Sequence, residues 1–248
     1  MNAVRLSVRN VSKTYPKGDG SVLADITFDV ANGEVIAVVG RNGCGKSTLL
    51  QIIAGLLEPS SGSTELRETE SDDIAVGMVF QDYDKSLLPW RSCLDNITLP
   101  LEAHKHMRAL ERRERARAFI SDLGIDLPLK NYPYEMSGGQ KQLTCVVRAL
   151  IRRPALLLLD EPFAALDYFN RHEVRKSLQS ILAAMNLTCV FVSHELDDAV
   201  LMSDRVIVLA GVPTTTRRIV ILESPRPRTD PDSVKRPREE ILEALEVA

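Results

Sequence analysis

The residues from Gly40 to Thr48 fit the pattern G-x-x-x-x-G-K-[ST], which is typical of a phosphate-binding loop. Its glycines let the backbone turn tightly and bring N–H groups close to an anion. Lys46 adds a positive charge for the β- and γ-phosphates, and the hydroxyl of Ser47 is suited to coordinate Mg²⁺. The loop therefore predicts a site for a nucleoside triphosphate with Mg²⁺. The residues expected to hold the nucleotide here are Gly40, Asn42, Gly43, Cys44, Gly45, Lys46, Ser47 and Thr48.

Two adjacent carboxylates, Asp160 and Glu161, follow an apolar run from residue 155 to residue 159. An acid at the carboxyl end of a buried parallel strand lies at the ligand crevice of an α/β sheet. We expect Asp160 to hold Mg²⁺ and Glu161 to polarise the water that attacks the terminal phosphate. A solvated strand end is the alternative interpretation, and the phosphate-binding loop elsewhere in the chain weakens it.

Three further side chains stand at the ends of predicted strands. Gln81 is suited to reach Mg²⁺ or water, although a solvent-facing strand end is an equal alternative. His194 is suited to bond the γ-phosphate, although such a histidine taken alone is more often structural. For Tyr15, stacking on an adenine ring and simple packing are equally supported.

The residues from Ser137 to Gln140 place two glycines at the start of another predicted helix. Ser137 is suited to cap this helix, which is the plain structural interpretation. The glycines also open the helix N-terminus towards an anion. Because one chain needs only one cradle for a γ-phosphate, we expect this second one to serve a nucleotide held by another copy of the protein.

The spacing of apolar residues predicts an α/β fold that positions these groups. Alternating runs at 4–14 and 22–30 predict a small antiparallel layer. Buried or closing strands are expected at 35–39, 74–80, 155–159, 187–193, 205–209 and 217–222. Helices are expected at 49–54, 92–122, 138–151, 170–186, 195–202 and 239–247. Residues 68–73 predict an acidic loop, and residues 224–237 predict a flexible linker because they are rich in proline and charge.

The composition is that of an ordinary soluble globular protein, with 248 residues, 44% of them hydrophobic, and a net charge of −3 that argues against recruitment of nucleic acid. Arginines between residues 108 and 117 are interleaved with Glu and predict a solvated helix face rather than a nucleic-acid or lipid patch. Four scattered cysteines argue against disulfides or a zinc site and suit a reducing compartment. We expect no signal peptide and no membrane span, so the chain is cytosolic or rests on a membrane through a partner.

An apolar segment lies at Leu87, Leu88 and Trp90, between prolines and charged residues. We expect these three side chains to be exposed. Such a segment is either a packed loop or a patch that binds a partner.

The order of these motifs, from about Val4 to Leu222, resembles the nucleotide-binding subunit of ATP-binding-cassette (ABC) transporters. The resemblance implies a P-loop NTPase (RecA-like) core at 1–84 and 152–222 that includes an antiparallel β subdomain. It also implies an inserted α-helical signature subdomain at 85–151 and a C-terminal linker with a short helix at 223–248. Met136 stands where Leu is usual before the signature, and Leu143 stands where many members have Arg; neither change removes a phosphate donor.

The resemblance assigns a role to each motif. Residues 40–47 are similar to Walker A, residues 156–161 to Walker B with its catalytic carboxylate, and residues 137–140 to the signature sequence. Gln81 is similar to the Q-loop residue and Asp167 to the D-loop residue. The nucleotide contacts implied beyond the phosphate-binding loop are Tyr15, which stacks on adenine, and Ser137, Gly139, Gln140 and Asp167.

The same resemblance implies the catalytic and metal-binding roles. Glu161 acts as general base, Lys46 and the switch histidine His194 stabilise charge, and Gln81 links the γ-phosphate to the helical subdomain. The residues implied to hold Mg²⁺ are Ser47, Gln81 and Asp160.

The implied function is ATP hydrolysis that energises a separate membrane permease. Residues 80–97 are similar to those of importers of nitrate, sulfonate, taurine and related compounds. The implied partners are a second ATPase subunit, either another copy or a paralogue, a permease that docks near Gln81–Trp90, and a solute-binding protein that acts indirectly; nucleic acid is not among them. The implied location is peripheral, at the cytoplasmic face of the inner membrane.

Two alternatives remain at this stage. One is an ABC-type ATPase that acts on nucleic acid or ribosomes rather than in transport, although the chain has neither a long coiled-coil insertion nor a second cassette. The other is a different P-loop enzyme such as a kinase or GTPase, against which the motif at 137–140 and the Asp160–Glu161 pair argue.

Overall fold

A six-stranded mixed sheet forms the centre of the molecule in a computed structural model that describes residues 3–16, 20–67, 74–103, 106–228 and 232–246. Its strands follow the order β5-β6-β7-β3-β8-β9, and β9 alone among them runs antiparallel to its neighbour. Their bounds are β3 Val35–Gly40, β5 Ile74–Val79, β6 Pro154–Asp160, β7 Thr188–Ser193, β8 Arg205–Ala210 and β9 Thr215–Ile221. Strands β3, β6 and β7 are buried along their whole length, as continuous apolar runs in a parallel sheet require.

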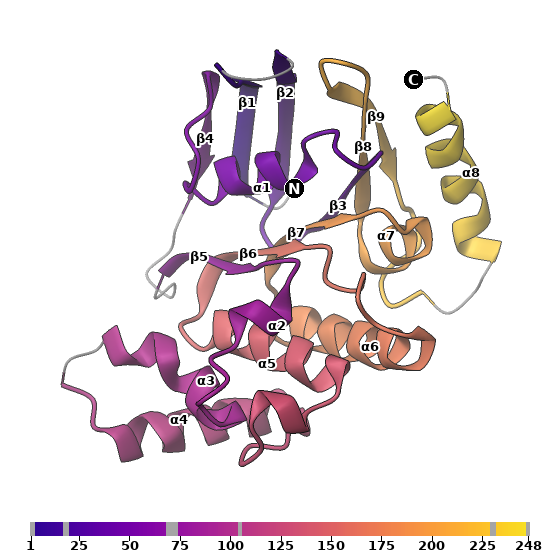
Figure 1. Cartoon of the computed structure of the whole chain (residues 1–248). Coiled ribbons are helices and arrows are strands. Elements are labelled where there is room, and N and C mark those ends of the chain that lie inside the picture. Colours follow the sequence, from indigo (N-terminus) through magenta and orange to yellow (C-terminus); the bar gives the residue numbers. More distant parts are fainter. Residues whose placement is uncertain (1–2, 17–19, 68–73, 104–105, 229–231, 247–248) are drawn as a thin grey trace.

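A three-stranded antiparallel sheet, in the order β2-β1-β4, lies above one face of the central sheet (Figure 1). Its strands are β1 Val4–Thr14, β2 Ser21–Ala31 and β4 Ser61–Leu66. Buried and exposed residues alternate along much of β1 and β2, so one face of this sheet is apolar. That face and helix α1, Lys46–Ile53, share a hydrophobic core with strands β3, β6 and β7.

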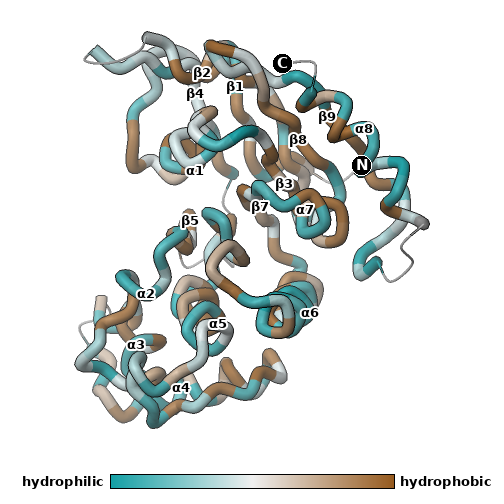
Figure 2. Tube along the Cα trace, turned by 45° about the vertical axis from the view of Figure 1, so that its right-hand side comes forward, coloured by the Kyte–Doolittle hydropathy of each residue, from teal (hydrophilic) through white to brown (hydrophobic). Residues whose placement is uncertain are grey.

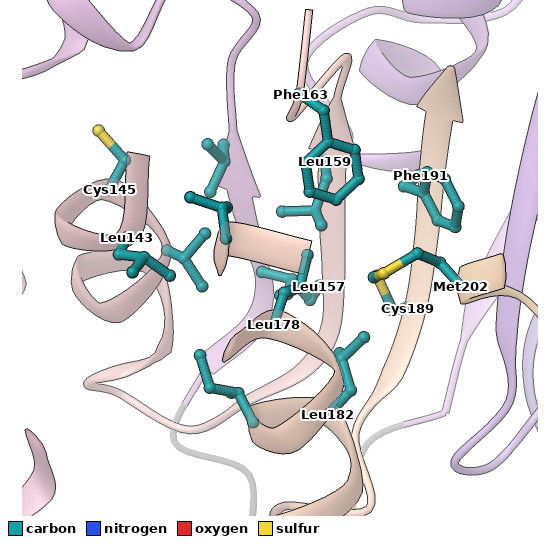
Figure 3. Close-up of a cluster of buried hydrophobic side chains, with 14 of the residues drawn as sticks. Leu143, Cys145, Leu157, Leu159, Phe163, Leu178, Leu182, Cys189, Phe191 and Met202 are labelled. Carbon is teal, nitrogen blue, oxygen red and sulfur yellow. The ribbon is translucent and has the colours of Figure 1, made fainter. Parts of the chain in front are cut away.

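Helices cover the opposite face of the central sheet. The helical layer contains α2 Tyr83–Ser86, α3 Cys93–Thr98, the 3₁₀ segment η1 Leu99–Ala103, α4 Ala109–Asp122, the 3₁₀ segment η2 Pro133–Glu135 and α5 Gly138–Leu150. Helices α6 Tyr168–Ala184, α7 Leu196–Met202 and α8 Asp232–Glu246 complete the fold. The hydropathy colouring in Figure 2 shows the central strands as mainly apolar, and Figure 3 shows Phe163, Leu178 and Phe191 converging between the sheet and the helices.

The predicted helix at 92–122 is wrong as one element. The chain forms α3 and η1, ends η1 at Ala103, and begins α4 only at Ala109. Pro100 lies inside η1, where it disfavours continuation of an α-helix from α3. The acidic loop predicted at 68–73 lies outside the described residues.

The linker predicted at 224–237 is also wrong in its extent. Helix α8 begins at Asp232 instead of Glu239, and it contains Pro237. Arg228, inside the supposed linker, is 7% exposed and donates hydrogen bonds to the backbone carbonyls of Val200, Ser203, Leu222 and Ser224. Tertiary contacts therefore order a segment whose composition suggested flexibility.

Among the described residues, no helix combines the length and the apolar character needed to cross a bilayer.

The packing in Figure 3 predicts a large stability cost for truncating Phe191, which is 1% exposed in β7. Phe191→Ala should lower the free energy of unfolding by about 3–5 kcal/mol, because a cavity replaces the ring. Ile221→Ala is the matched control, since Ile221 in β9 is 67% exposed and its truncation should cost less than about 0.5 kcal/mol. Urea unfolding followed by circular dichroism measures both, and equal costs would contradict the packing.

Candidate functional site

The polar residues expected to do chemistry collect at the carboxyl edge of the central sheet. Residues following β3, β5, β6 and β7 meet there, where open α/β sheets bind ligands. A pocket of about 510 Å³ opens at this edge. Its lining residues are Tyr15, Val22, Asn42, Gly43, Gly45, Lys46, Ser47, Thr48, Gln81, Glu161 and His194. Sequence reasoning named all of these except Val22.

The phosphate-binding loop has the conformation its glycines suggest. Gly45, the residue before α1, has a φ of 95°, and Gly43 has a φ of 79°. A Cβ on Gly45 would lie 2.8 Å from carbons of Val22 and Leu23, so β2 presses against the loop. The loop therefore requires glycine at position 45 for its backbone conformation and also for space.

Lys46 is 6% exposed and turns back onto its own loop. Its ammonium donates hydrogen bonds to the carbonyl oxygens of Gly40 at 2.9 Å and Arg41 at 3.2 Å. These carbonyls hold a nearly buried cation at the floor of the pocket. Such a charge is suited to an anionic ligand, because little water remains around the buried ammonium to screen its attraction for the anion.

Ser47 and Asp160 join the phosphate-binding loop to the end of β6. The Ser47 hydroxyl donates to Oδ1 of Asp160 at 3.0 Å. Burial raises the pKa of Asp160 above its usual value, the hydrogen bond from Ser47 lowers it, and the charge of Glu161 raises it further. The nearby charge of Lys46 opposes the increase, but burial is the largest cause and decides the direction.

Glu161 and His194 form a hydrogen-bonded pair at the pocket, between Oε2 of the carboxylate and Nδ1 of the ring. Glu161 has a φ of 50°, a region that non-glycine residues seldom occupy. Its N–H donates to the carbonyl of Val192 at 3.1 Å, which holds this conformation against β7. The chain therefore turns sharply after Asp160 and directs Glu161 towards the same space as His194.

Tyr15 lines the pocket and is 38% exposed. The ammonium of Lys13 lies 5.4 Å from the centre of its ring. A half-exposed ring beside a phosphate-binding loop is suited to stacking on an aromatic base. Val22, which sequence reasoning missed, lines the same pocket from the start of β2.

Cys44 fills space inside the loop. A Cβ placed on Gly40 would lie 2.7 Å from its sulfur, so the thiol packs directly over Gly40. Burial raises the pKa of the Cys44 thiol, and the charge of Lys46 opposes this increase. A thiol with a raised pKa is a packing group rather than a reactive one.

Six expected nucleotide contacts are absent from the pocket lining: Gly40 and Cys44 in the phosphate-binding loop, and Ser137, Gly139, Gln140 and Asp167 outside it. Ser137 and Gln140 form a capping box at α5: the Gln140 N–H donates to Oγ of Ser137, and Oε1 of Gln140 accepts from the Ser137 N–H. Asp167 caps α6 by accepting from the N–H groups of Phe169 and Asn170. The side-chain hydrogen bond from Asn170 lowers the pKa of Asp167.

The starts of α5 and α6 form a second region, in which Ser137 and Asp167 are exposed and Gly139 is buried. A Cβ on Gly139 would lie 3.2 Å from Oδ1 of Asn170, and one on Gly138 would lie 3.2 Å from Leu166. The glycines therefore let α5 approach α6 closely. One chain thus contains two separate groups of candidate residues, one in the pocket and one outside it.

The segment after Gln81 is fastened to α5. Lys141 forms an ion pair of 2.7 Å with Asp84, and Arg148 donates to the carbonyl of Ser86 at 2.7 Å. The hydroxyl of Tyr83 lies 3.4 Å from the carbonyl of Ala165, in the turn that precedes α6. A displacement of Gln81 would therefore be transmitted to both α5 and α6.

The apolar segment that follows is only partly exposed. Trp90 is 71% exposed, but Leu87 is 2% exposed and Leu88 is half-buried, so the expectation for the two leucines is wrong. Asn96, fully buried, accepts from the N–H of Leu88 and donates to the carbonyls of Leu88, Arg91 and Ser92. Sequence reasoning missed Asn96, because no local pattern distinguishes a loop-organising asparagine from a solvated one.

The chain belongs to the ABC transporter family. The family described as "ABC transporter" matches residues 23–164 of this chain. A relative that the chain covers over most of its length supports the same assignment. The chain is therefore an ATP-binding domain of this family, and its class is that of an ATPase.

Named relatives refine the comparison. The chain is 40% identical over 233 residues to the nitrate import ATP-binding protein NrtC of Synechococcus elongatus, covering 91% of the chain but only 35% of NrtC. It is 37% identical to the nitrate transport protein NasD of Klebsiella oxytoca, covering 90% of the chain and 87% of NasD. It is also 37% identical to the aliphatic sulfonates import ATP-binding protein SsuB 1 of Burkholderia lata, covering 92% of the chain and 67% of that relative.

Solved structures confirm the fold. A dimeric ABC cassette, MJ0796, in a post-hydrolysis state with ADP and Pi, has a TM-score of 0.73 at 28% identity, covering 88% of this chain and 99% of that one. The cbiO1 protein of Clostridium perfringens, part of the transporter complex cbiONQ, has a TM-score of 0.79 at 25% identity, covering 97% and 93%. The predicted family and α/β P-loop fold class are confirmed, and transport is favoured over the nucleic-acid alternative.

The loop geometry predicts different costs for two glycine substitutions. Gly45→Ala should lower the free energy of unfolding without nucleotide by at least about 2 kcal/mol, since its methyl group would overlap Val22 and Leu23. Gly43→Ala is the matched control: it also has positive φ, but no atom lies within 4 Å of its Cβ, so its cost is about 1 kcal/mol. Urea unfolding distinguishes them; indistinguishable costs would mean that β2 does not press on the loop.

Proposed function

We propose that the pocket binds ATP with Mg²⁺ and hydrolyses it to energise a separate membrane permease that imports small anions. The observation that carries this proposal is the Glu161–His194 pair, which lines the same pocket as the buried cation Lys46 and the hydroxyl of Ser47. A base, a charge for the phosphates and a metal-binding hydroxyl are the parts that phosphoryl transfer to water requires.

The oxygen donors at Ser47 and Asp160 fit Mg²⁺, which prefers hydroxyl, carboxylate and water ligands. The two side chains are hydrogen-bonded at 3.0 Å, and Asp160 is 6% exposed, so a bound cation would offset the cost of burying its charge. Gln81 at the pocket wall would contribute its amide oxygen. When bound, Mg²⁺ supplies positive charge to the phosphates.

Each remaining residue of the pocket has a role in this proposal. Glu161 accepts a proton from the attacking water, and His194 holds its carboxylate and donates towards the γ-phosphate. Lys46 exchanges its two carbonyl partners for the β- and γ-phosphates, and Tyr15 stacks on adenine. The backbone of the loop binds the phosphates through the residues Gly40, Asn42, Gly43, Cys44, Gly45, Ser47 and Thr48.

A second ATPase subunit, identical or paralogous, completes the site. Ser137, Gly139, Gln140 and Asp167 would contact the nucleotide held by the partner in a two-fold arrangement. Support comes from their position outside the pocket of their own chain and from the dimeric state of the related cassette MJ0796.

In this arrangement the helical unit at 85–151 moves as a body against the core at 1–84 and 152–222, and the segment at 223–248 belongs with the core.

The permease docks on the segment from Gln81 to Trp90. The exposed ring of Trp90 offers an apolar contact, and Lys141 and Arg148 fasten the preceding turn to α5. Docking there places the chain at the cytoplasmic face of the inner membrane as a peripheral subunit. A solute-binding protein would act on this subunit only through the permease. No nucleic acid takes part.

The names of the relatives support the proposed class of solute. The relatives reported above are named for nitrate and aliphatic sulfonates, which are small anions. Uptake of each anion by vesicles that contain this chain with its permease tests the class, and transport of none of them would remove it.

Replacing the base tests the mechanism. Glu161→Gln should lower ATP turnover by at least about 100-fold, because the amide cannot accept the proton. ATP then persists in the site, so size-exclusion chromatography with ATP should show a stable dimer. Turnover is measured as phosphate release.

Glu173→Gln is the control for this substitution, because Glu173 is exposed on α6. It should retain wild-type turnover and form no trapped dimer. Normal hydrolysis by the Glu161→Gln protein would contradict the assignment of the base.

The docking segment gives a separate prediction. Trp90→Ala should weaken binding to a candidate permease in detergent by about 30-fold, as loss of an exposed anchor of an interface does. Asn96→Leu should give a similar loss while Trp90 remains, because it removes the hydrogen bonds that shape the segment.

Leu110→Ala is the matched control, since Leu110 is 66% exposed on α4 outside the segment. Its affinity for the permease should equal that of the wild type. Undiminished binding by the Trp90→Ala protein would exclude this segment as the docking site.

A further inference from the structure

Helix α8 packs beside α7 and the β8–β9 hairpin, on the side of the central sheet that carries β9 (Figure 1). Ile241 is fully buried and Ala244 is 6% exposed, so one face of α8 belongs to the core. Two hydrogen-bonded contacts connect α8 to the surroundings of the proposed ATP site, one with the phosphate-binding loop and one with α7, the helix that follows His194.

The first contact joins the end of α8 to the phosphate-binding loop. Nη2 of Arg41 donates to the carbonyl oxygen of Leu245 at 3.2 Å, although the two residues are 204 positions apart. Carbonyls in the last turn of a helix lack partners within the helix and carry partial negative charge. The last turn of α8 contains no basic residue of its own. Arg41 therefore supplies the cation that this helix end favours.

The same residue holds the interior of the loop through its backbone. The carbonyl oxygen of Arg41 accepts from the Lys46 ammonium and from the Cys44 N–H, both at 3.2 Å. Fixing the guanidinium of Arg41 on α8 therefore fixes the carbonyl that positions Lys46. The exposed side chain of Arg41 and the buried ammonium of Lys46 are parts of one connected structure.

The second contact joins α8 to the segment after His194. Nε of Arg238 lies 2.9 Å from Oδ1 of Asp197 on α7, a helix that begins two residues after His194. Arg218 on β9 lies 3.8 Å from Glu240, which holds the middle of α8 to the sheet. The helix therefore bridges the loop that contains Lys46 and the helix that follows the histidine.

We propose that Arg41 is a positioning residue of the ATP site, and that it acts through the end of α8. The anchored loop keeps the arrangement that the phosphates require, so less conformational entropy is lost when ATP binds. Removing the anchor raises the KM for ATP and leaves kcat largely intact, because Arg41 acts through the loop and not on the reacting atoms. The inference rests on the proposed ATP site, whose existence is tested separately by ATP binding to the unaltered chain.

The simpler explanation of any effect is charge, because Arg41 is a cation near a site for a polyanion. Charge alone would make Arg41 important whether or not α8 is present. The two explanations therefore differ in what they predict for α8, and the experiment measures the helix as well as the kinetics.

The experiment compares Arg41→Gln with the wild type and with Arg236→Gln, which removes an arginine that is 88% exposed on α8. We expect Arg41→Gln to raise the KM for ATP by about fivefold with kcat within about twofold, equivalent to about 1 kcal/mol. Hydrogen–deuterium exchange without nucleotide should become faster at residues 41–45 and at 239–246 together. Arg236→Gln should leave KM and the exchange of residues 41–45 unchanged.

A second arm shortens the chain after Leu242 and so removes the Leu245 carbonyl. In the shortened chain, Arg41→Gln should cause no further rise in KM, since the partner of Arg41 is already gone. A further fivefold rise there, an unchanged KM in the full chain, or unchanged exchange of α8 would each overturn the proposal. If the shortened chain does not fold, the exchange and KM of the full-length proteins decide the question alone.

Discussion

The site depends on two opposite charges, Lys46 and Asp160, that the fold holds almost out of water without pairing them to each other. Each is 6% exposed at the carboxyl edge of a sheet whose central strands are fully buried. Lys46 relies on backbone carbonyls and Asp160 on one hydroxyl, which are weaker partners than an opposite charge. Both charges therefore gain when an anion and a cation arrive together, which is how a nucleoside triphosphate binds with its metal ion.

The same edge of the sheet connects the pocket to the surface proposed to meet the permease. Gln81 lines the pocket, and the turn after it is fastened to α5 by Lys141 and Arg148. Asn96 then fixes the loop that presents Trp90. The contacts of Lys141 and Arg148 join the segment to α5, so a displacement of α5 would move the segment with it. The exposed ring of Trp90 would carry that displacement to the surface proposed for docking.

The sequence was sufficient for the parts of the structure that depend on local patterns. The buried strands β3, β6 and β7 follow from uninterrupted apolar runs, and the conformation of the loop at Gly45 follows from its glycines. Other features depend on tertiary contacts that no local pattern contains. The positive φ of Glu161 is held by the carbonyl of Val192, and α8 forms through a region that contains Pro237 because Ile241 and Ala244 bury against the core.

The arrangement of α5 and α6 bears on how two subunits would act together. The close approach of Gly139 to Asn170, and of Gly138 to Leu166, makes the starts of these helices one unit. Tyr83 bonds to the turn before α6, so this unit is also in contact with the segment after Gln81. A subunit that offers Ser137 and Asp167 to its partner's nucleotide would therefore register that contact in its own docking segment. In a two-fold dimer each subunit would contact the nucleotide of the other in the same way. Each permease contact would therefore respond to both nucleotides.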